Sequence, residues 1–410
     1  MTRDRTQICI LGGGFGGLYT ALYLSKFSWS RKCHITLVEP KDRFLFTPLL
    51  YELLTAELQP REISPSYQKL LQGTNVELCQ DRMTKIQFKN HQVNLESGKR
   101  LNYDYLIIAV GNRGRIADLP GAEYAINFRT LADLESIEGK IELKERSGKA
   151  KLQVAVVGAG ASGVELASKL ADRLPKQAQI RLIDRSSEIL KDFPAPIRSA
   201  ASRALKKRNV KIDLETSVAK ITDKSISLRS PQNETVTLPA DLVLWTTGSQ
   251  SHQTIADLDY CKLDCYGKIL TLPTLQLIDY AEVFAIGDAA KIYDNSQLLP
   301  TTAQVAYQQA RAIAKNIEAS IKGNPLKPFR YNHLGDMLTL GDGAAVIYSF
   351  SLLLEGYLAA IIRKLVYLQR LPTNRHRRQV LRNILIRGFK RIFSVKGKPK
   401  LNYIKTNKKT

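Results

Sequence analysis

Apolar residues near the start of the chain alternate between short runs and helically spaced positions. Residues 8–11 are an apolar run of strand length, and a second run, residues 34–38, follows about twenty residues later. Between the two runs, apolar positions recur at the spacing of one helix face: Leu18, Ala21, Leu22 and Leu24. We therefore predict a strand, a helix and a second, parallel strand, which is the repeating unit of an α/β sheet.

The same pattern recurs in the middle of the chain. Residues 153–157 predict a strand, residues 164–174 a helix, and residues 180–184 a second strand. The two copies lie much farther apart than the 20–50-residue period of solenoid repeats. We therefore expect two separate α/β units.

Later segments predict further strands and a helix. Residues 101–111 and 240–248 each combine an acidic residue, an apolar strand and a terminal glycine, and the strand in residues 283–290 ends at Gly287-Asp288. A helix should begin near residue 303, because Pro300 and the cap candidates Thr301 and Thr302 precede an alanine-rich segment. Residues four apart share a helix face, so Gln304 and Gln308 should point the same way.

The C-terminal region is amphipathic. Residues 343–362 are largely apolar, but a glutamate, two serines and a second glycine interrupt them. We interpret them as a strand followed by the start of a helix, and not as a membrane span. One face of that helix should carry Leu358, Ile361, Ile362, Leu365 and Leu368. Its opposite face should carry Arg363, Lys364 and Arg370. Pro372 should end it, and residues 377–393 form a second apolar and basic segment.

Glycines follow the first predicted strand in the spacing GxGxxG. Gly12, Gly14 and Gly17 occupy the three positions, and Phe15 and Gly16 complete the loop. In dinucleotide-binding proteins the first glycine makes the turn, the second lets the backbone approach a pyrophosphate, and the third packs helix on strand. Glu39 ends the second strand, where a carboxylate can accept hydrogen bonds from ribose hydroxyls. The sequence therefore predicts a dinucleotide site.

The second copy repeats this fingerprint with Gly158, Gly160 and Gly163. Asp184 ends its second strand and favours a free ribose 2′-hydroxyl, as in NADH. Arg185 follows immediately and could accept the 2′-phosphate of NADPH. The choice between NADH and NADPH therefore stays open at this point, with NADH favoured.

Two fingerprints imply two dinucleotides, and the simplest chemistry for such a pair is hydride transfer between a nicotinamide and a flavin. The order of elements resembles that of two-dinucleotide flavoproteins. In these, Gly111 and Gly248 would mark the crossovers between domains, and Gly287 and Asp288 would meet the flavin's ribityl chain. The fold class is then α/β, with two Rossmann-like domains of the three-layer ββα type and the nicotinamide domain inserted in the flavin domain. The expected boundaries are 1–112 and 270–335 for FAD, 113–269 for NAD(P)H, and 336–410 for a C-terminal amphipathic helical segment that associates with a membrane.

Composition and charge add one constraint. The chain has 410 residues, 44% of them apolar, and a formal net charge of +23. Residues 361–410 contain sixteen Lys and Arg and no Asp or Glu. Such a block indicates an anionic partner, either a lipid surface or a nucleic acid. The five cysteines form no CxxC, and the five histidines are scattered, so neither a disulfide framework nor a metal site is predicted.

With these motifs in place, the chain resembles the type II NAD(P)H:quinone dehydrogenases, single-subunit flavoenzymes of the membrane surface. The resemblance covers residues 7–345 and is carried by four segments: FLFTPLLYELLTAEL at 44–58, GVELASKL at 163–170, AQVAYQ at 303–308 and HLGDMLTLGDGAAV at 333–346. FTPLLYELL and the RLPT at 370–373 are most similar to the cyanobacterial and plastid branch, which is associated with demethylnaphthoquinone reduction in phylloquinone formation.

The resemblance implies roles for particular residues. Ala303, Gln304 and Gln308 match the family's AQxAxQ pattern, whose helix faces the flavin ring and the quinone entrance. An amide can donate a hydrogen bond to a quinone carbonyl without adding a charge. Glu165, in GVELA, would lie near the nicotinamide and could steer the cofactor or relay protons. Its alternative is an acid placed near a helix start by the helix dipole. The implied cofactors are FAD and NAD(P)H, and the implied substrate is a membrane quinone, either a (demethyl)naphthoquinone or plastoquinone.

Three alternatives were weighed. A sulfide:quinone reductase needs two redox cysteines near the flavin, yet no cysteine lies between Cys79 and Cys261. A disulfide reductase needs CxxC or CxxxxC, which is absent. A nucleic-acid-binding flavoprotein would use the basic tail on phosphates, but the tail's apolar residues are mainly aliphatic, which favours an anionic membrane surface. We therefore expect a peripheral protein on the cytoplasmic or stromal face of a thylakoid or plasma membrane in a cyanobacterium-like cell. A homodimer is left open.

Overall fold

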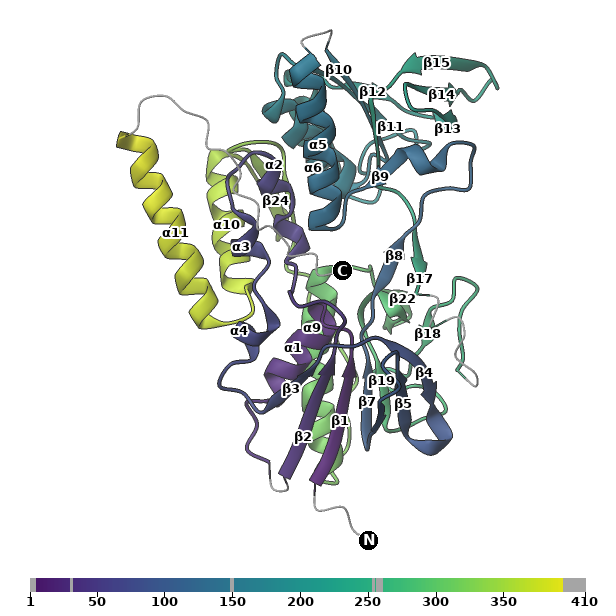
Figure 1. Cartoon of the computed structure of the whole chain (residues 1–410), viewed down its shortest axis with the longest axis vertical. Helices are drawn as coiled ribbons and strands as arrows, with labels where there is room; N and C mark the ends of the chain where they lie inside the picture. Colours follow the sequence, from purple (N-terminus) through teal and green to yellow (C-terminus); the bar gives the residue numbers. More distant parts are fainter. Residues whose placement is uncertain (1–4, 30–31, 148–150, 253–254, 256–260, 394–410) are drawn as a thin grey trace.

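The structure is a computed structural model that describes residues 5–29, 32–147, 151–252, 255 and 261–393, with side chains to residue 387. Two parallel β-sheets organise the molecule, one in its lower and one in its upper half (Figure 1). In spatial order, the strands of the lower sheet are β19 (Val283–Ala285), β7 (Tyr105–Ile108), β1 (Arg5–Leu11), β2 (Lys32–Val38) and β3 (Val76–Cys79). Their apolar runs are buried in one continuous core, as parallel strands covered on both faces require.

The upper sheet has the same organisation. Its strands, in spatial order, are β12 (Lys211–Asp213), β11 (Ala178–Ile183), β10 (Leu152–Val157), β16 (Leu242–Trp245) and β9 (Ala125–Asn127). Its helices are α5 (Leu131–Ser147), α6 (Ala161–Arg173) and α7 (Ala195–Lys207), and those of the lower sheet are α1 (Phe15–Leu24) and α9 (Ala303–Ile321). The α/β class with parallel sheets is therefore confirmed.

Each parallel sheet is accompanied by a small antiparallel one. The lower half contains β4 (Met83–Gln87), β5 (Gln92–Leu95) and β6 (Arg100–Asn102). The upper half contains β13 (Ser217–Ile221), β14 (Ser225–Arg229) and β15 (Thr235–Pro239). Between the halves, β8 (Asn112–Gly114) pairs antiparallel with β17 (Ser249–Ser251) (Figure 1). The chain thus leaves the lower half along β8, builds the upper sheet and returns along β17.

The C-terminal region differs in detail from the prediction. Residues 343–362 form two strands rather than one: β24 (Ala345–Ser349) and β25 (Leu352–Gly356) make an antiparallel hairpin before α10 (Tyr357–Arg370) begins. Phe350 and Ser351 form the turn with φ of +49° and +63°. Consecutive positive φ values are typical of a two-residue hairpin turn, but they favour Asn and Gly, so this sequence gives no turn signal. β23 (Asp336–Thr339) completes the sheet, and α11 (Asn374–Phe393) lies beside α10 (Figure 1).

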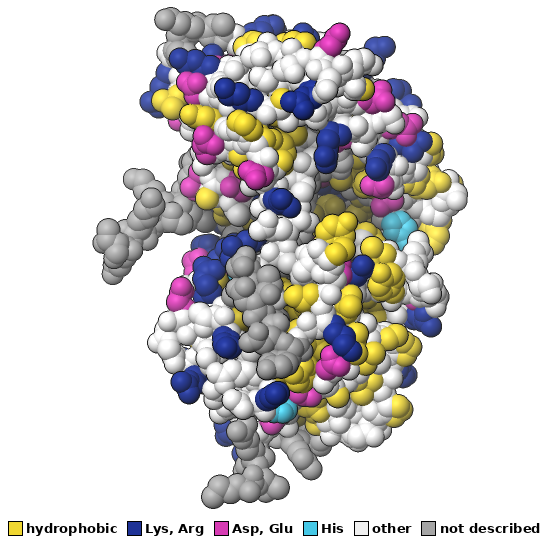
Figure 2. Space-filling view, turned by 90° about the vertical axis from the view of Figure 1, so that its right-hand side faces the viewer, with side chains coloured by type: hydrophobic (Ala, Val, Ile, Leu, Met, Phe, Trp, Pro, Cys, Tyr) yellow, Lys and Arg dark blue, Asp and Glu magenta, His cyan; other side chains and the backbone are white. Residues whose placement is uncertain are grey.

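Helix α10 turns its apolar face away from the protein. Leu358 and Leu365 are 57% and 56% exposed, and the hairpin tip exposes Phe350 (87%) and Leu352 (75%). Arg363, by contrast, is buried. Figure 2 shows the face on the other side of the molecule from α10 and α11, where Lys and Arg side chains are interspersed with Asp and Glu. No helix in the described part of the chain is both long and apolar enough to cross a membrane.

Candidate active site

The first glycine loop has the geometry of a pyrophosphate cradle. Gly12 adopts a φ of +93°, and its N–H donates to the Val38 carbonyl at 2.8 Å. A Cβ on Gly17 would lie 1.8 Å from the Gly12 carbonyl oxygen, so only glycine allows α1 to approach β1 this closely. A Cβ on Gly14 would meet nothing within 4 Å. Because Gly14 caps α1 without any side-chain hydrogen bond, the first N–H groups of the helix are available to an anion.

The second loop reproduces this geometry. Gly158 has a φ of +110°, a Cβ on Gly163 would lie 1.7 Å from the Gly158 carbonyl oxygen, and a Cβ on Gly160 would meet nothing within 4 Å. Gly160 caps α6, again without a side-chain hydrogen bond. The two loops therefore fit two dinucleotides, FAD and NAD(P)H, with the second glycine of each open toward the phosphates.

The carboxylates that end β2 and β11 hold these loops in place. Glu39 accepts hydrogen bonds from the backbone N–H of Gly13 at 2.7 Å and of Lys41 at 3.0 Å. Asp184 accepts from Ala159 N at 2.6 Å and Ser186 N at 2.7 Å. Each ionised carboxylate has further acceptor sites for a ribose hydroxyl. Arg185 is exposed beside Asp184, so the positive charge considered for a 2′-phosphate is present.

Phe15 and Gly16 face the protein rather than the open side of the first loop. The Phe15 ring packs edge-on against Phe44 and Phe46, with centroids 5.4 and 5.2 Å apart. A Cβ on Gly16 would lie 2.7 Å from Ile286. The Phe15 ring and the missing side chain at Gly16 therefore determine how α1 packs on the protein. These two residues would contact a cofactor through their backbone atoms.

The predicted crossover glycines lie at the two connections between the halves. Gly111 (φ +70°) immediately precedes β8, and Gly248 (φ +80°) immediately precedes β17. A Cβ on Gly248 would lie 2.9 Å from the Arg115 carbonyl oxygen, whereas one on Gly111 would meet nothing within 4 Å. Both positions use the left-handed backbone conformation that glycine tolerates best.

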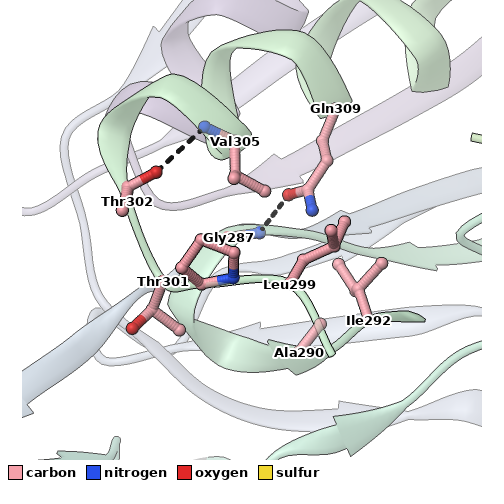
Figure 3. A pocket seen from close by; sticks show the side chains of 9 residues that line it. Gly287, Ala290, Ile292, Leu299, Thr301, Thr302, Val305 and Gln309 are labelled. Carbon is pink, nitrogen blue, oxygen red and sulfur yellow. Dashed lines mark hydrogen bonds between the residues drawn. The ribbon is translucent and has the colours of Figure 1, made fainter. Parts of the chain in front are cut away.

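The Gly287-Asp288 turn lies against the start of α9. Gly287 N donates to the Gln309 side-chain oxygen at 2.8 Å, and Thr302 caps α9 by accepting from Val305 N (Figure 3). Gly287, Thr302, Val305 and Gln309 all line one small open pocket (Figure 3). Burial raises the pKa of Asp288, and the positive charges of Arg129 and Lys268 oppose this rise. Ala303, the first residue of α9, follows the cap directly. The sequence identified the turn and the cap but missed Gln309, which is buried and fixes the turn to the helix.

The two predicted amides share one face of α9, and both contact the segment that follows the helix. Gln304 Oε1 accepts from Tyr331 Oη at 2.6 Å and from Leu334 N at 3.2 Å. Gln308 binds the backbone of Asn332 in both directions, donating to its carbonyl at 2.8 Å and accepting from its N–H at 3.0 Å. Both side chains remain partly exposed, so they can still meet a ligand.

Glu165 lies in a buried ionic cluster. Its Oε1 accepts from Thr339 N at 2.8 Å and from Arg363 Nη2 at 3.1 Å, and Arg363 also pairs with Glu52 of α2 (Tyr51–Leu54). The first turn of α6 contains no acid and Glu165 follows it, so placement by the helix dipole does not explain this residue. Burial raises the pKa of Glu165 to about 7, although Arg363 and the Thr339 N–H oppose the rise.

A second buried ion group lies one helical turn away. Lys169 of α6 and Lys364 of α10 both pair with Glu57, the latter at 2.7 Å. Despite burial, the two ammonium groups lower the pKa of Glu57 to about 2. The two ion groups together join α10 to both halves of the molecule. They contain three acids and three bases, so their net charge is zero when Glu165 is ionised. Burial thus raises the pKa of Glu165, while the two ammonium groups lower that of Glu57, so the two buried acids differ in how firmly they hold a proton.

Arg363 is a functional candidate that the sequence analysis missed. Its side chain is only 3% exposed, and its guanidinium stacks 4.8 Å from the Tyr367 ring centroid. The pattern placed Arg363 opposite the apolar face of its helix, which is correct, but the expectation that this basic residue meets an anionic partner is wrong, because Arg363 is buried. A buried arginine needs carboxylate partners, and GVELA and FTPLLYELL supply them from distant parts of the chain.

Comparison with known proteins identifies the family. A model of the pyridine nucleotide-disulphide oxidoreductases matches residues 6–310. NDH2 from Plasmodium falciparum in complex with NADH has the same fold, with a TM-score of 0.85 at 20% identity, and the match covers 97% of this chain and all of that one. The sulfide:quinone oxidoreductase of Aquifex aeolicus shares it at a TM-score of 0.78 and 20% identity, over 90% of this chain and 92% of that one. The chain belongs to the pyridine nucleotide-disulphide oxidoreductases.

Closer relatives define the subgroup. The chain is 42% identical over 395 residues to the demethylphylloquinone reductase of Synechocystis sp., covering 94% of this chain and 97% of that protein. It is 38% identical over 413 residues to the alternative NAD(P)H-ubiquinone oxidoreductase C1 of Arabidopsis thaliana, covering 92% of this chain and 80% of that one. Within the family, it is a type II NAD(P)H:quinone oxidoreductase, a flavoenzyme with FAD and NAD(P)H as cofactors, which confirms the resemblance seen in its motifs.

Proposed function

We propose that the chain oxidises NAD(P)H and reduces a membrane naphthoquinone of the demethylphylloquinone type, with plastoquinone as the second candidate. The observation that carries the proposal is the pair of matching glycine cradles in one chain, which supplies a flavin and a nicotinamide site. The Synechocystis reductase, at 42% identity, supports the choice of quinone. Both cradles and the α9 amides come from one chain, so a homodimer is not needed to complete the site.

In this proposal the lower half, residues 1–112 and 270–335, binds FAD, and residues 113–269 bind NAD(P)H. When bound, FAD accepts the electron pair of the nicotinamide and releases it to the quinone. The protein aligns the two rings and excludes water. Asp288 would hold the flavin's ribityl chain, and the N-terminus of α9 would face its ring. Gln304 and Gln308 would line the quinone entrance, and Glu165 would exchange a proton beside the nicotinamide domain.

Cofactor choice depends on Asp184. Its carboxylate should repel a 2′-phosphate, and exposed Arg185 should relieve part of that repulsion. We expect Asp184→Ser to shift the ratio of kcat/KM values toward NADPH, with Glu188→Ser as a control that removes an acid four residues away. An unchanged ratio in Asp184→Ser would mean that this carboxylate does not contact the ribose.

Gln304 should act on the quinone side of the reaction. In Gln304→Leu, reduction of the flavin by NADH should stay nearly normal, and reoxidation by quinone should slow roughly threefold to tenfold, the value of one neutral hydrogen bond. Gln308→Leu, which loses only contacts to Asn332, is the matched comparison. Stopped-flow absorbance measures flavin reduction by NADH and flavin reoxidation by quinone separately in each variant. Slower reduction by NADH with normal reoxidation would place α9 on the nicotinamide side instead.

We also propose that the enzyme is a peripheral protein whose exposed apolar face of α10 lies on an anionic membrane surface. The outward orientation of Leu358 and Leu365 supports this, since burial in lipid removes them from water. Exposed Arg378 and Arg382 on α11 add positive charge. The cytoplasmic or stromal face of a thylakoid or plasma membrane is the expected location.

Vesicle binding tests this orientation. Leu358→Ser combined with Leu365→Ser should weaken binding to anionic phospholipid vesicles at least tenfold, because each leucine contributes about 1.5–3 kcal/mol when fully buried. Leu143→Ser on α5, at 69% exposure, is the matched control and should bind normally. Equal binding of the double variant and the control would contradict the proposal. Preferential binding to duplex DNA over the vesicles would favour nucleic acid instead.

The sulfide:quinone alternative is not favoured. No disulfide joins the cysteines, and burial raises the pKa of Cys9 to about 12 and that of Cys261 to about 11. Thiols held protonated in this way are poor nucleophiles toward sulfide or disulfide sulfur.

A further inference from the structure

The segment between α9 and β23 carries a row of hydrogen-bonding side chains that ends at Gln304. Tyr331 Oη donates to Gln304 Oε1 at 2.6 Å, and the same hydroxyl lies 3.3 Å from His333 Nδ1. His333 Nε2 lies 3.5 Å from Asp336 Oδ2. The row therefore runs from Asp336 through the exposed imidazole of His333 and the hydroxyl of Tyr331 to the amide that we place at the quinone entrance.

This row lies beside the exposed hairpin. Ser349 Oγ donates to the Leu334 carbonyl at 2.9 Å, and Ser349 is followed directly by the exposed residues of the hairpin tip. A Cβ on Gly335 would lie 2.5 Å from the Tyr348 carbonyl oxygen, so the segment packs tightly on β24. Since the hairpin tip is apolar, a quinone from the membrane and a proton from water can both reach this region of the surface.

We propose that Tyr331 is a catalytic proton donor to the quinone, and that His333, held by Asp336, returns the proton to it. This deepens the function proposed above and rests on the quinone binding beside Gln304. Reduction of a quinone to a quinol consumes two electrons and two protons. FAD, when bound and reduced, would supply the electron pair and one proton. Tyr331 Oη–H supplies the other, breaking its O–H bond as the quinol O–H forms. The phenolate then regains a proton from the imidazole of His333 through Nδ1, and water returns a proton to the imidazole.

The surroundings of Tyr331 suit a donor. Burial, and then the negative charge of Asp336, raises its pKa to about 12, so the phenol stays protonated until an acceptor arrives. The neighbouring cation, Arg330, is directed to Asp294 at 2.7 Å, and Tyr331 N binds the same carboxylate at 2.8 Å. These contacts fix the backbone while the hydroxyl can turn from Gln304 to a quinone oxygen.

Tyr331→Phe tests the proposal in the flavin-loaded full chain. The flavin is first reduced with NADH and then reoxidised, either with 2-methyl-1,4-naphthoquinone or with ferricyanide, which takes electrons but no protons. Loss of a general acid should slow the naphthoquinone step by about a hundredfold or more, with ferricyanide and NADH rates unchanged. The wild-type naphthoquinone step should slow in D₂O, and this isotope effect should change in Tyr331→Phe. His333→Gln should show a smaller loss in the same step, and Tyr266→Phe, an exposed tyrosine elsewhere, should show none.

Four outcomes decide the matter. Naphthoquinone reoxidation and an isotope effect that are unchanged in Tyr331→Phe overturn the donor role. Equal slowing with ferricyanide overturns it too, because it indicates a damaged flavin site. If Gln304→Leu slows reoxidation and Tyr331→Phe does not, the quinone still binds beside Gln304, but Tyr331 is not its proton donor. If naphthoquinone does not reoxidise the wild-type flavin at all, the proposed function itself fails.

Discussion

Replacing Arg363 with methionine should lower the thermal stability of the flavin-loaded enzyme by several degrees or more. The substitution removes the guanidinium that pairs with the buried carboxylates of Glu52 and Glu165. Breaking a buried ion pair from one side costs about 3–5 kcal/mol. Because α10 also carries the exposed apolar face, weaker attachment of this helix should reduce vesicle binding together with stability. Flavin release on heating measures the first effect.

Lys364→Met is the matched control for this prediction. Lys364 is 38% exposed, and its partner Glu57 keeps the buried Lys169, so the loss should stay within about 1 kcal/mol. Adding Glu52→Gln to Arg363→Met should restore part of the stability, since it removes one of the unpaired charges. Equal melting temperatures for Arg363→Met and Lys364→Met would show that the buried cluster does not hold α10 in place.

Gly163→Ala should give a yellow protein that NADH reduces at least a hundredfold more slowly. The new Cβ would lie 1.7 Å from the Gly158 carbonyl oxygen, so α6 must move away from the loop to which we assign the nicotinamide cofactor. A displacement of about 1 Å at such a site can cost about a hundredfold in rate. In the proposed assignment FAD binds at the other cradle, so it should be retained. Absorbance of the flavin before and after addition of NADH reports both properties.

Gly139→Ala controls for the added methyl group. Gly139 lies in α5 of the same half of the molecule, and a Cβ there would meet nothing within 4 Å. It should therefore behave as wild type. Loss of FAD in Gly163→Ala, with NADH binding retained, would exchange the two cofactor assignments.

Local sequence patterns predicted the parts of the site whose chemistry depends on neighbouring residues. The spacing of Gly12, Gly14 and Gly17 predicts a strand, turn and helix because each glycine allows a turn or a close backbone approach that a larger side chain would prevent. The cap at Thr302 was likewise predictable, since it satisfies an N–H group three residues along the chain. Asp184 and Glu39 follow from the same rules.

The remaining features depend on contacts between distant segments. Nothing near Arg363 in the sequence distinguishes it from the other basic residues of the tail, and only its partners, more than 190 residues away, explain its burial. Gln309 was missed because its partner, Gly287, lies in another element. The hairpin before α10 escaped prediction because Phe350 and Ser351 adopt positive φ values without the usual turn residues.

The central claim is that one chain takes electrons from NAD(P)H onto FAD and delivers them to a quinone. Anaerobic stopped-flow absorbance of the purified chain tests it most directly, with NADH added first and 2-methyl-1,4-naphthoquinone second. The account predicts a yellow protein whose flavin absorbance is lost with NADH and recovered with one equivalent of the quinone. A folded, colourless protein that gains no flavin spectrum when FAD is added, or a flavin that NADH reduces and no quinone reoxidises, would contradict it.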